Sequence, residues 1–569
     1  MSQAEQERPQ EQREASGSEA EAEQVQQFGA VFYITVAISA VFVLAGVFFT
    51  DPFGSALATV VGWITGYLGW LYMLMTSFFL VFAIWLALSR YGKIRLGQPN
   101  DRPEFGHFAW FAMLFQAGMG IGLVFWAVSE PVTHYTDPPL GMAQPETPGA
   151  ASLALQTAFF HWGLHPWAIY AVVGLAVAYF SYRRGMTNLQ VSTVFRPLIG
   201  DRVDGPIGKA IDVIAIIATL FGVAVSLGLG TLQIDAGLGE AFGLPSGIGL
   251  QLIIIAITAV AYMLSASTPI NKGVNILSQT SMYIAFALLV YFIIVGPTLL
   301  QLNSFTQETG VYLANLIPQS FNMAAFEPQE ATWLADWTIF FWATWIAWAP
   351  YVGVFIARIS RGRTIREFIL GVMFAPTIFS MIWFSVFGAA SIQADNQTNG
   401  AISSAAGTSE ALGLFAFLEQ TPLFLFTSIS MIFLVWIFFV AGADAGTIVL
   451  GSMSAGGVLN PKRLIKLTWG AIMGALAAIL LLTGGLDALQ NGAILAATPF
   501  AILMCLMCWC LYKTLKRDYR EERQQVQEIM AHDQNVEKQQ MQEIMRRHEA
   551  GEPVGSAMPD SSNSGMRKG

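Results

Sequence analysis

Apolar stretches long enough to cross a lipid bilayer constrain the fold of this chain more than any other feature. Of its 569 residues, 54% are hydrophobic and only 12% are charged, whereas soluble domains are roughly 25% charged. Inside a bilayer, a helix satisfies the backbone hydrogen bonds of its own segment. The sequence therefore predicts an all-α polytopic membrane protein with twelve transmembrane helices, at about 29–49, 62–88, 108–128, 152–180, 211–233, 247–265, 275–298, 337–357, 367–389, 422–442, 464–484 and 493–512.

The basic residues predict the orientation of these spans. All 29 Lys and Arg residues lie in the two tails, in alternate loops or at the span edges beside them, for example in 90–102, 183–209 and 358–366. Because Lys and Arg concentrate on the cytoplasmic side, we expect both termini in the cytoplasm and the chain in the inner (cytoplasmic) membrane. A miscounted span would break the alternation, which supports the number twelve.

The spans and their flanks divide the chain into six segments. We expect a cytoplasmic disordered N-terminal tail at 1–28, two peripheral transmembrane helices and a cytoplasmic loop at 29–107, a first repeat (helices 3–7) at 108–300, an extracytoplasmic amphipathic connection at 301–335, a second repeat (helices 8–12) at 336–512 and a cytoplasmic C-terminal tail at 513–569. The last tail is expected to contain a helix of roughly 30 residues. It either senses ionic strength through anionic lipid headgroups or is simply solvated.

Two interruptions at matching positions indicate how the spans are arranged. Gly118, Gly120 and Gly122 weaken the helix of the third span, and Pro350 is expected to bend the eighth. Spans three and eight run in opposite directions, so spans 3–7 and 8–12 form two inverted five-helix repeats. Such paired interruptions point to the substrate site of a secondary transporter. The alternative for the glycines is close helix packing through G-x-x-x-G.

An aromatic stripe runs through the eighth span. Phe341, Trp342, Trp345 and Trp348 fall within an arc of about 120° on a helix that turns 100° per residue. Tryptophans of membrane proteins usually lie at the lipid interface, whereas this stripe continues across the span. Aromatic faces attract diffuse positive charge, so the stripe predicts a quaternary ammonium ligand.

The fourth span supplies a second group of rings and two histidines. Trp162, Trp167 and Tyr170 could form the opposite wall of an aromatic box. His161 and His165 are four residues apart, as in a zinc helix, but the Glu of H-E-x-x-H is absent. We therefore expect no metal there, and packing or hydrogen-bonded histidines, with a proton relay left open.

Two carboxylates within or beside the spans are candidates for function, because a charge in the membrane is costly. Asp444 lies at or just past the end of the tenth span, where it either caps a broken helix or acts in transport. Glu130, at the outer end of the third span, is either structural or part of a gate.

Six motifs together resemble the betaine/carnitine/choline transporter family: Gly118-Met119-Gly120-Ile121-Gly122, Ser129-Glu130-Pro131, His161-Trp162 to Tyr170, Lys272-Gly273-Val274, Trp337 to Gly353, and Ala357-Arg358-Ile359-Ser360-Arg361-Gly362-Arg363-Thr364. The resemblance covers nearly all of 29–512. It implies a LeuT-like fold of twelve helices with two inverted five-helix repeats, and a homotrimer. It also implies an aromatic box for a trimethylammonium group, made here of Trp162, Trp167, Tyr170, Phe340, Trp345 and Trp348, with Trp342 near the exit path and the backbone of Gly118, Met119, Gly120 and Gly122 alongside.

The chain departs from the family pattern at the box and at the ion site. Thr344 stands where many members carry Trp, and its hydroxyl could bond a polar group of the substrate. Ala441-Gly442 replaces the Thr-Ser of sodium-coupled members, Val223 replaces a hydroxyl residue, and Ser281 stands where sodium-independent exchangers have Arg. The coupling ion, Na+ or H+, therefore stays open. The expected ion residues are Gln116, Met119, Thr219, Ser281, Tyr351, Ala441 and Asp444.

These features predict a secondary active transporter that imports a betaine-type onium solute, such as glycine betaine or choline, by alternating access with cation coupling. The alternatives are a dimethylsulfoniopropionate, carnitine or ectoine transporter of the same fold, or a non-transporting osmosensor. We expect no enzyme, because no nucleophile–base or metal set emerges. No cofactor, metal or nucleic acid is expected, and the partners are the solute, membrane lipid and two further copies of the chain.

Overall fold

The computed structural model describes residues 28–118, 120–185, 190–267, 273–327, 330–458 and 460–550. The chain divides into two compact units, Met1–Leu511 and Tyr512–Gly569. The regular secondary structure of the described residues is helical, apart from an isolated antiparallel bridge between Arg95 and Thr364.

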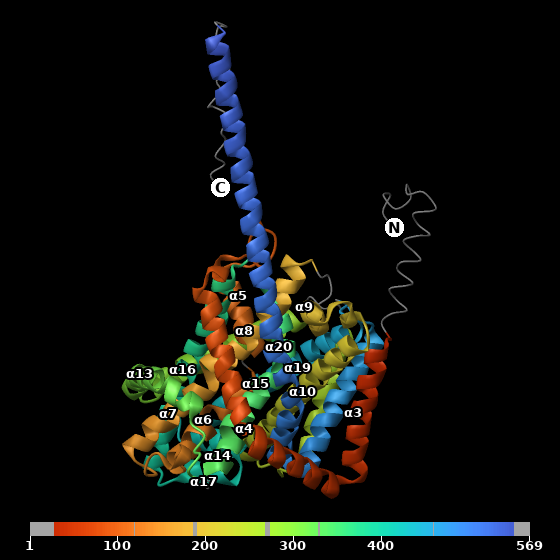
Figure 1. Cartoon of the computed structure of the whole chain (residues 1–569). Helices are drawn as coiled ribbons and strands as arrows, with labels where there is room; N and C mark the ends of the chain where they lie inside the picture. Colours follow the sequence, from red (N-terminus) through yellow and green to blue (C-terminus); the bar gives the residue numbers. More distant parts are fainter. Residues whose placement is uncertain are drawn as a thin grey trace, which may run out of the picture. The chain divides into compact units, whose positions relative to one another are not determined.

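Long helices make up the first unit (Figure 1). They are α3 (Ala30–Phe48), α4 (Thr50–Leu88), α5 (His107–Gly118), α6 (Ile121–Thr136), α7 (Pro148–Trp162), α8 (Leu164–Ala178), α10 (Pro206–Phe242), α11 (Ile248–Ser267), α12 (Gly273–Val295), α13 (Thr298–Phe321), α15 (Phe340–Ile359), α16 (Ile365–Gln397), α17 (Ala401–Thr408), α18 (Glu410–Glu419), α19 (Phe424–Ser454) and α20 (Arg463–Glu549). The helix α20 continues into the second unit, where Val526, Ile529, Met530, Met541 and Met545 are exposed.

Nine helices of the described residues are long and apolar enough to cross a membrane, or ten if the α12–α13 pair, bent by 109°, counts as one. The prediction of an all-helical chain with membrane-length helices is confirmed. The number twelve stays a prediction, because α5 and α6 divide the third predicted span. The last two predicted spans share α20, where the backbone leaves the helical region at Gly484 and Gly485.

The helix that was expected to bend at Pro350 is continuous. The prediction of an interruption at Pro350 was wrong: α15 runs from Phe340 to Ile359 with this proline inside it. Proline loses one hydrogen bond, but its φ angle suits a helix, and a free carbonyl is tolerated where protein buries it. The irregular turn lies earlier, in a five-residue π-helix at Ala335–Ile339.

A break that the sequence analysis did not predict separates α7 from α8. Gly163 sits between them with φ −96° and ψ −131°. A Cβ atom there would lie 2.8 Å from the hydroxyl oxygen of Tyr312 in α13, so no larger residue fits without movement. The same hydroxyl accepts the backbone N–H of Leu164 at 3.1 Å, which satisfies one donor at the start of α8.

Candidate functional site

Four buried aromatic rings from three helices meet beside this break. Trp162 ends α7, Trp167 and Tyr170 lie on α8, and Trp345 lies on α15. Ring centroids are 4.9 Å apart for Trp162 and Trp345, 6.2 Å for Tyr170 and Trp345, and 5.5 Å for Trp167 and Tyr170, all edge to face. We call these residues the four-ring cluster. The structure thus brings Trp345 of the eighth predicted span to the three rings predicted on the fourth.

Phe341 contacts two rings of the cluster directly, whereas Phe340 reaches Phe341, at 5.3 Å between ring centroids. Phe341 stacks on Trp345 at 6.2 Å and meets Trp162 edge to face at 5.6 Å. Phe340 packs instead on Trp126 at 6.1 Å. The family resemblance implies Phe340 as the box residue. Helical periodicity instead places Phe341 on the face of Trp345, because residues four apart share a face.

Two other predicted ring residues point elsewhere. The indole N–H of Trp342 donates to the sulfur of Met73 at 3.2 Å, and its ring stacks on His165 at 5.1 Å. Trp348 is only partly buried and packs edge to face on Tyr351 at 5.3 Å. A Cβ atom at Gly222 of α10 would lie 2.9 Å from the Trp348 ring, so that glycine admits the indole. A substrate role for both tryptophans stays a prediction.

The glycines of the third span lie around its break. Gly120 precedes α6 with φ −144° and ψ −135°. A Cβ atom at Gly122 would lie 3.0 Å from the ring of Trp162, so this glycine allows the α6 backbone to approach the four-ring cluster. Met119 lies outside the described residues, and only the backbone of Gln116 and Gly118 is described.

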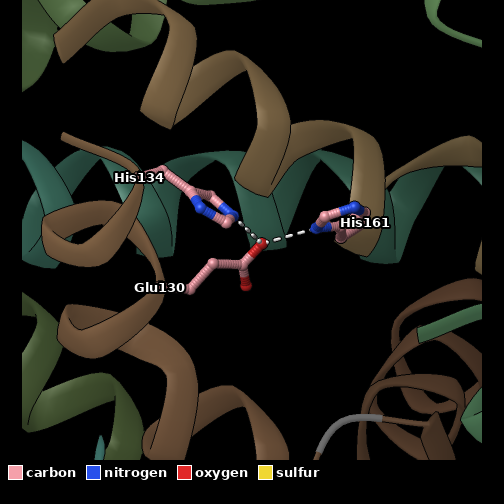
Figure 2. A group of neighbouring side chains, drawn as sticks. All are labelled: Glu130, His134 and His161. Atoms are coloured by element: carbon pink, nitrogen blue, oxygen red, sulfur yellow. Dashed lines mark hydrogen bonds and ion pairs between the residues drawn. The ribbon is translucent and has the colours of Figure 1, made fainter. Parts of the chain in front are cut away.

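A buried carboxylate, that of Glu130, lies at the N–H edge of the Trp162 indole. The indole N–H of Trp162 donates to Oε2 of Glu130 at 2.8 Å. His161 Nδ1 lies 2.7 Å from Oε1 of Glu130, and His161 Nε2 lies 2.9 Å from the Thr338 hydroxyl. Figure 2 shows His134 and His161 approaching the carboxylate from two sides. Glu130, His134 and His161 are fully buried.

The distance between His161 and Glu130 fits a hydrogen bond better than joint coordination of a metal ion. The ligand atoms of Glu130, His134 and His161 lie within 4.8 Å of one another. Tetrahedral zinc with bonds of about 2.0–2.1 Å holds its ligand atoms about 3.3 Å apart, but His161 and Glu130 are 2.7 Å apart, which is a hydrogen-bond distance. His134 Nε2 is 3.7 Å from Glu130, and neither ring nitrogen of His134 has a hydrogen-bond partner among the described residues.

The two histidines of the fourth span have separate partners. His161 bonds Glu130 and Thr338, whereas His165 Nε2 lies 3.1 Å from the hydroxyl of Ser320. The expectation that they are packed, hydrogen-bonded histidines agrees with this geometry.

The predicted ion residues whose side chains the structure describes are buried, and some of their oxygens have no hydrogen-bond partner among the described residues. Ser265 donates to Oδ2 of Asp444 at 2.5 Å, while Oδ1 has no hydrogen-bond partner among the described residues. The hydroxyls of Thr219 and Thr344 also lack one within the described chain. Ser281, Tyr351 and Ala441 are buried. Unpaired buried oxygens are the kind of atom that binds a cation or a substrate donor.

A cavity of about 690 Å³ lies away from the four-ring cluster. Its lining includes Gln190, Arg196, Lys209 and Asp212, and none of the predicted ring or ion residues. At the four-ring cluster the rings pack directly on one another, so the candidate site is defined by converging side chains.

Comparison with known proteins identifies the relatives of this chain. The family model described as the betaine/carnitine/choline family transporter matches residues 30–520. The glycine betaine transporter OpuD of Bacillus subtilis is 47% identical, over 87% of this chain and 96% of that protein. The ectoine/hydroxyectoine transporter of Virgibacillus pantothenticus is 37% identical, over 87% and 98%. The osmo-dependent choline transporter BetT2 of Acinetobacter baylyi is 37% identical, over 86% and 72%.

Proposed function

Because the chain belongs to the betaine/carnitine/choline family of transporters, we propose that it is a secondary active transporter importing glycine betaine or a related onium solute such as choline. The observation that carries this proposal is the four-ring cluster, buried between α7, α8 and α15. Ring faces attract a methylated ammonium group, which has no hydrogen bonds to offer. Membership of a transporter family also assigns the chain to transport rather than to catalysis.

Glycine betaine is the substrate that we favour among the family's solutes. The relative at 47% identity is named a glycine betaine transporter, and the rings supply contacts for its trimethylammonium head. Choline and ectoine are the rivals supported by relatives at 37% identity, and carnitine and dimethylsulfoniopropionate fit the same chemistry. The hydroxyl of Thr344, which has no partner in the described part of the chain, is available for the polar end of the solute.

The transport cycle that we propose uses a twelve-helix fold with two inverted five-helix repeats, 108–300 and 336–512. Both termini lie in the cytoplasm, the chain lies in the inner membrane, and three copies associate. Rocking of the two repeats separates the packed rings and admits the solute. Na+ or H+ drives the cycle, bound near Thr219, Tyr351 and Asp444, with Gln116, Met119, Ser281 and Ala441 close by.

Uptake by the purified chain in proteoliposomes tests the proposal. Labelled glycine betaine is supplied while sodium and proton gradients are imposed separately, and choline, ectoine, carnitine and dimethylsulfoniopropionate compete in turn. We expect gradient-driven, saturable uptake that glycine betaine inhibits best. Trp345→Ala should weaken the apparent affinity for glycine betaine, whereas Trp70→Ala, which removes an exposed tryptophan of α4, should not.

Two outcomes would contradict the proposal. Stronger inhibition by another solute would replace glycine betaine as the substrate. Absence of uptake of every solute under both gradients, from correctly inserted protein, would favour the non-transporting osmosensor.

A further inference from the structure

The carboxylate of Glu130 accepts hydrogens on both of its oxygens. Oε2 takes the indole N–H of Trp162 at 2.8 Å, and Oε1 lies 2.7 Å from Nδ1 of His161. The Thr338 hydroxyl lies 2.9 Å from Nε2 of His161. In the tautomer that carries its hydrogen on Nδ1, His161 donates to Glu130 and accepts from Thr338. A proton on either carboxylate oxygen would then meet a donor rather than an acceptor.

Within the part of the chain that the structure describes, no Lys or Arg forms an ion pair with this carboxylate. Its ion-pair contacts among the described residues are with His134 and His161. His134 Nε2, at 3.7 Å, is too distant to accept a hydrogen bond from a protonated carboxyl. Among the described residues, a negative charge here is balanced by the N–H donors of Trp162 and His161, which leaves it available to a cation that binds on the other side of Trp162.

Two neighbouring contacts fix the rings relative to this charge. The Trp162 indole is held at its N–H edge by Glu130, while Gly122 allows the α6 backbone to lie against the same ring. Trp162 meets Trp345 at 4.9 Å. A carboxylate hydrogen-bonded to an indole N–H adds electron density to the ring face, and this strengthens the attraction of that face for a cation.

We propose that Glu130 is a positioning residue that also supplies the counter-charge of the onium site: it holds Trp162 in place and makes the site prefer a cationic head over a neutral one of the same shape. This inference rests on the proposed function, and it assigns Glu130 to substrate selectivity rather than to packing or gating.

The test compares a solute with its neutral-headed copy. In 3,3-dimethylbutanoate a carbon atom replaces the ammonium nitrogen of glycine betaine, so its head has the same shape without the charge. Both compounds compete with labelled glycine betaine for uptake into proteoliposomes. The readout is the selectivity ratio, the inhibition constant of 3,3-dimethylbutanoate divided by that of glycine betaine.

Glu130→Gln keeps the shape and an acceptor oxygen but loses the charge. We expect glycine betaine to bind about 10-fold more weakly, with no loss for the neutral copy, so the selectivity ratio falls about 10-fold or more. Glu130→Asp retains the carboxylate and should keep the ratio within about 3-fold of the wild type even where the uptake rate drops. This second variant keeps the test decisive if the first does not fold.

Glu308→Gln is the matched control. Glu308 is a buried carboxylate of α13 that accepts hydrogen bonds from Ser152 and Gln307 at 2.7 Å, and its substitution should leave the selectivity ratio unchanged. If Glu130→Gln weakens both compounds equally, or Glu130→Asp lowers the ratio, Glu130 is only a structural brace and the inference is overturned. Absence of wild-type uptake in the same liposomes would instead contradict the proposed function.

Discussion

The indole N–H of Trp345 donates to the backbone carbonyl oxygen of His161 at 3.0 Å. The carbonyl is free because α7 ends at Trp162 and a new helix begins at Leu164. Helix ends leave carbonyls without an internal partner. The break at Gly163 therefore attaches α15 to α7 and orients Trp345 toward Trp162.

Removal of the Trp345 ring should weaken substrate binding. A cation–π contact contributes about 0.5–2 kcal/mol, so Trp345→Ala should raise the apparent KM for glycine betaine about 2- to 30-fold, and more if His161 loses its orientation. Trp345→Phe keeps a ring face and should lose less. Initial uptake rates at a series of glycine betaine concentrations measure the effect, and wild-type affinity in Trp345→Ala would contradict the site.

Gly163→Ala should destabilise the protein. Its Cβ atom would lie 2.8 Å from the Tyr312 hydroxyl oxygen, and forcing extra volume into a packed site costs about 1–3 kcal/mol. The midpoint of thermal unfolding in detergent measures the loss. Gly62→Ala in α4, where a Cβ meets no atom within 4 Å, serves as the control and should unfold at the wild-type temperature. Equal midpoints for both variants would show that the break is not needed.

Thr344→Val should alter transport without altering stability. The hydroxyl of Thr344 has no hydrogen-bond partner among the described residues, so its loss removes no internal bond. If the hydroxyl bonds the polar end of the solute, the apparent affinity should fall about 3- to 10-fold, the equivalent of one hydrogen bond. Thr344→Ser should retain the affinity. A Thr344→Val protein with unchanged affinity and selectivity would remove this residue from the site.

Asp444→Asn should separate transport from its driving gradient. Oδ2 of Asp444 accepts from Ser265 at 2.5 Å, and Oδ1 is unpaired among the described residues. A bound cation could therefore contact Oδ1. We expect the stimulation of uptake by the coupling gradient to fall about 5-fold or more, while exchange of labelled for unlabelled solute persists. Asp212→Asn, at another buried carboxylate, should keep the full stimulation.

Composition by itself determined that the chain is a helical membrane protein. Periodicity determined which of its aromatic residues share a helix face. A bilayer allows few backbone solutions, so apolar length alone predicts helices, and the 100° turn per residue places Phe341 and Trp345 on one face of α15. The charge pattern predicts the orientation of the spans, because loops rich in Lys and Arg stay on the cytoplasmic side.

Tertiary structure decided which of these residues meet. The ring of Phe341, not that of Phe340, lies against Trp345, while Trp342 turns to Met73. The position of Glu130 in the sequence indicates a structural residue or a gate, and only the packing of α6 on α7 brings it to Trp162. The break at Gly163 and the continuity through Pro350 were likewise missed. The period of a helix gives the direction of a side chain about its own axis, but the residue that it meets depends on how helices distant in sequence pack together.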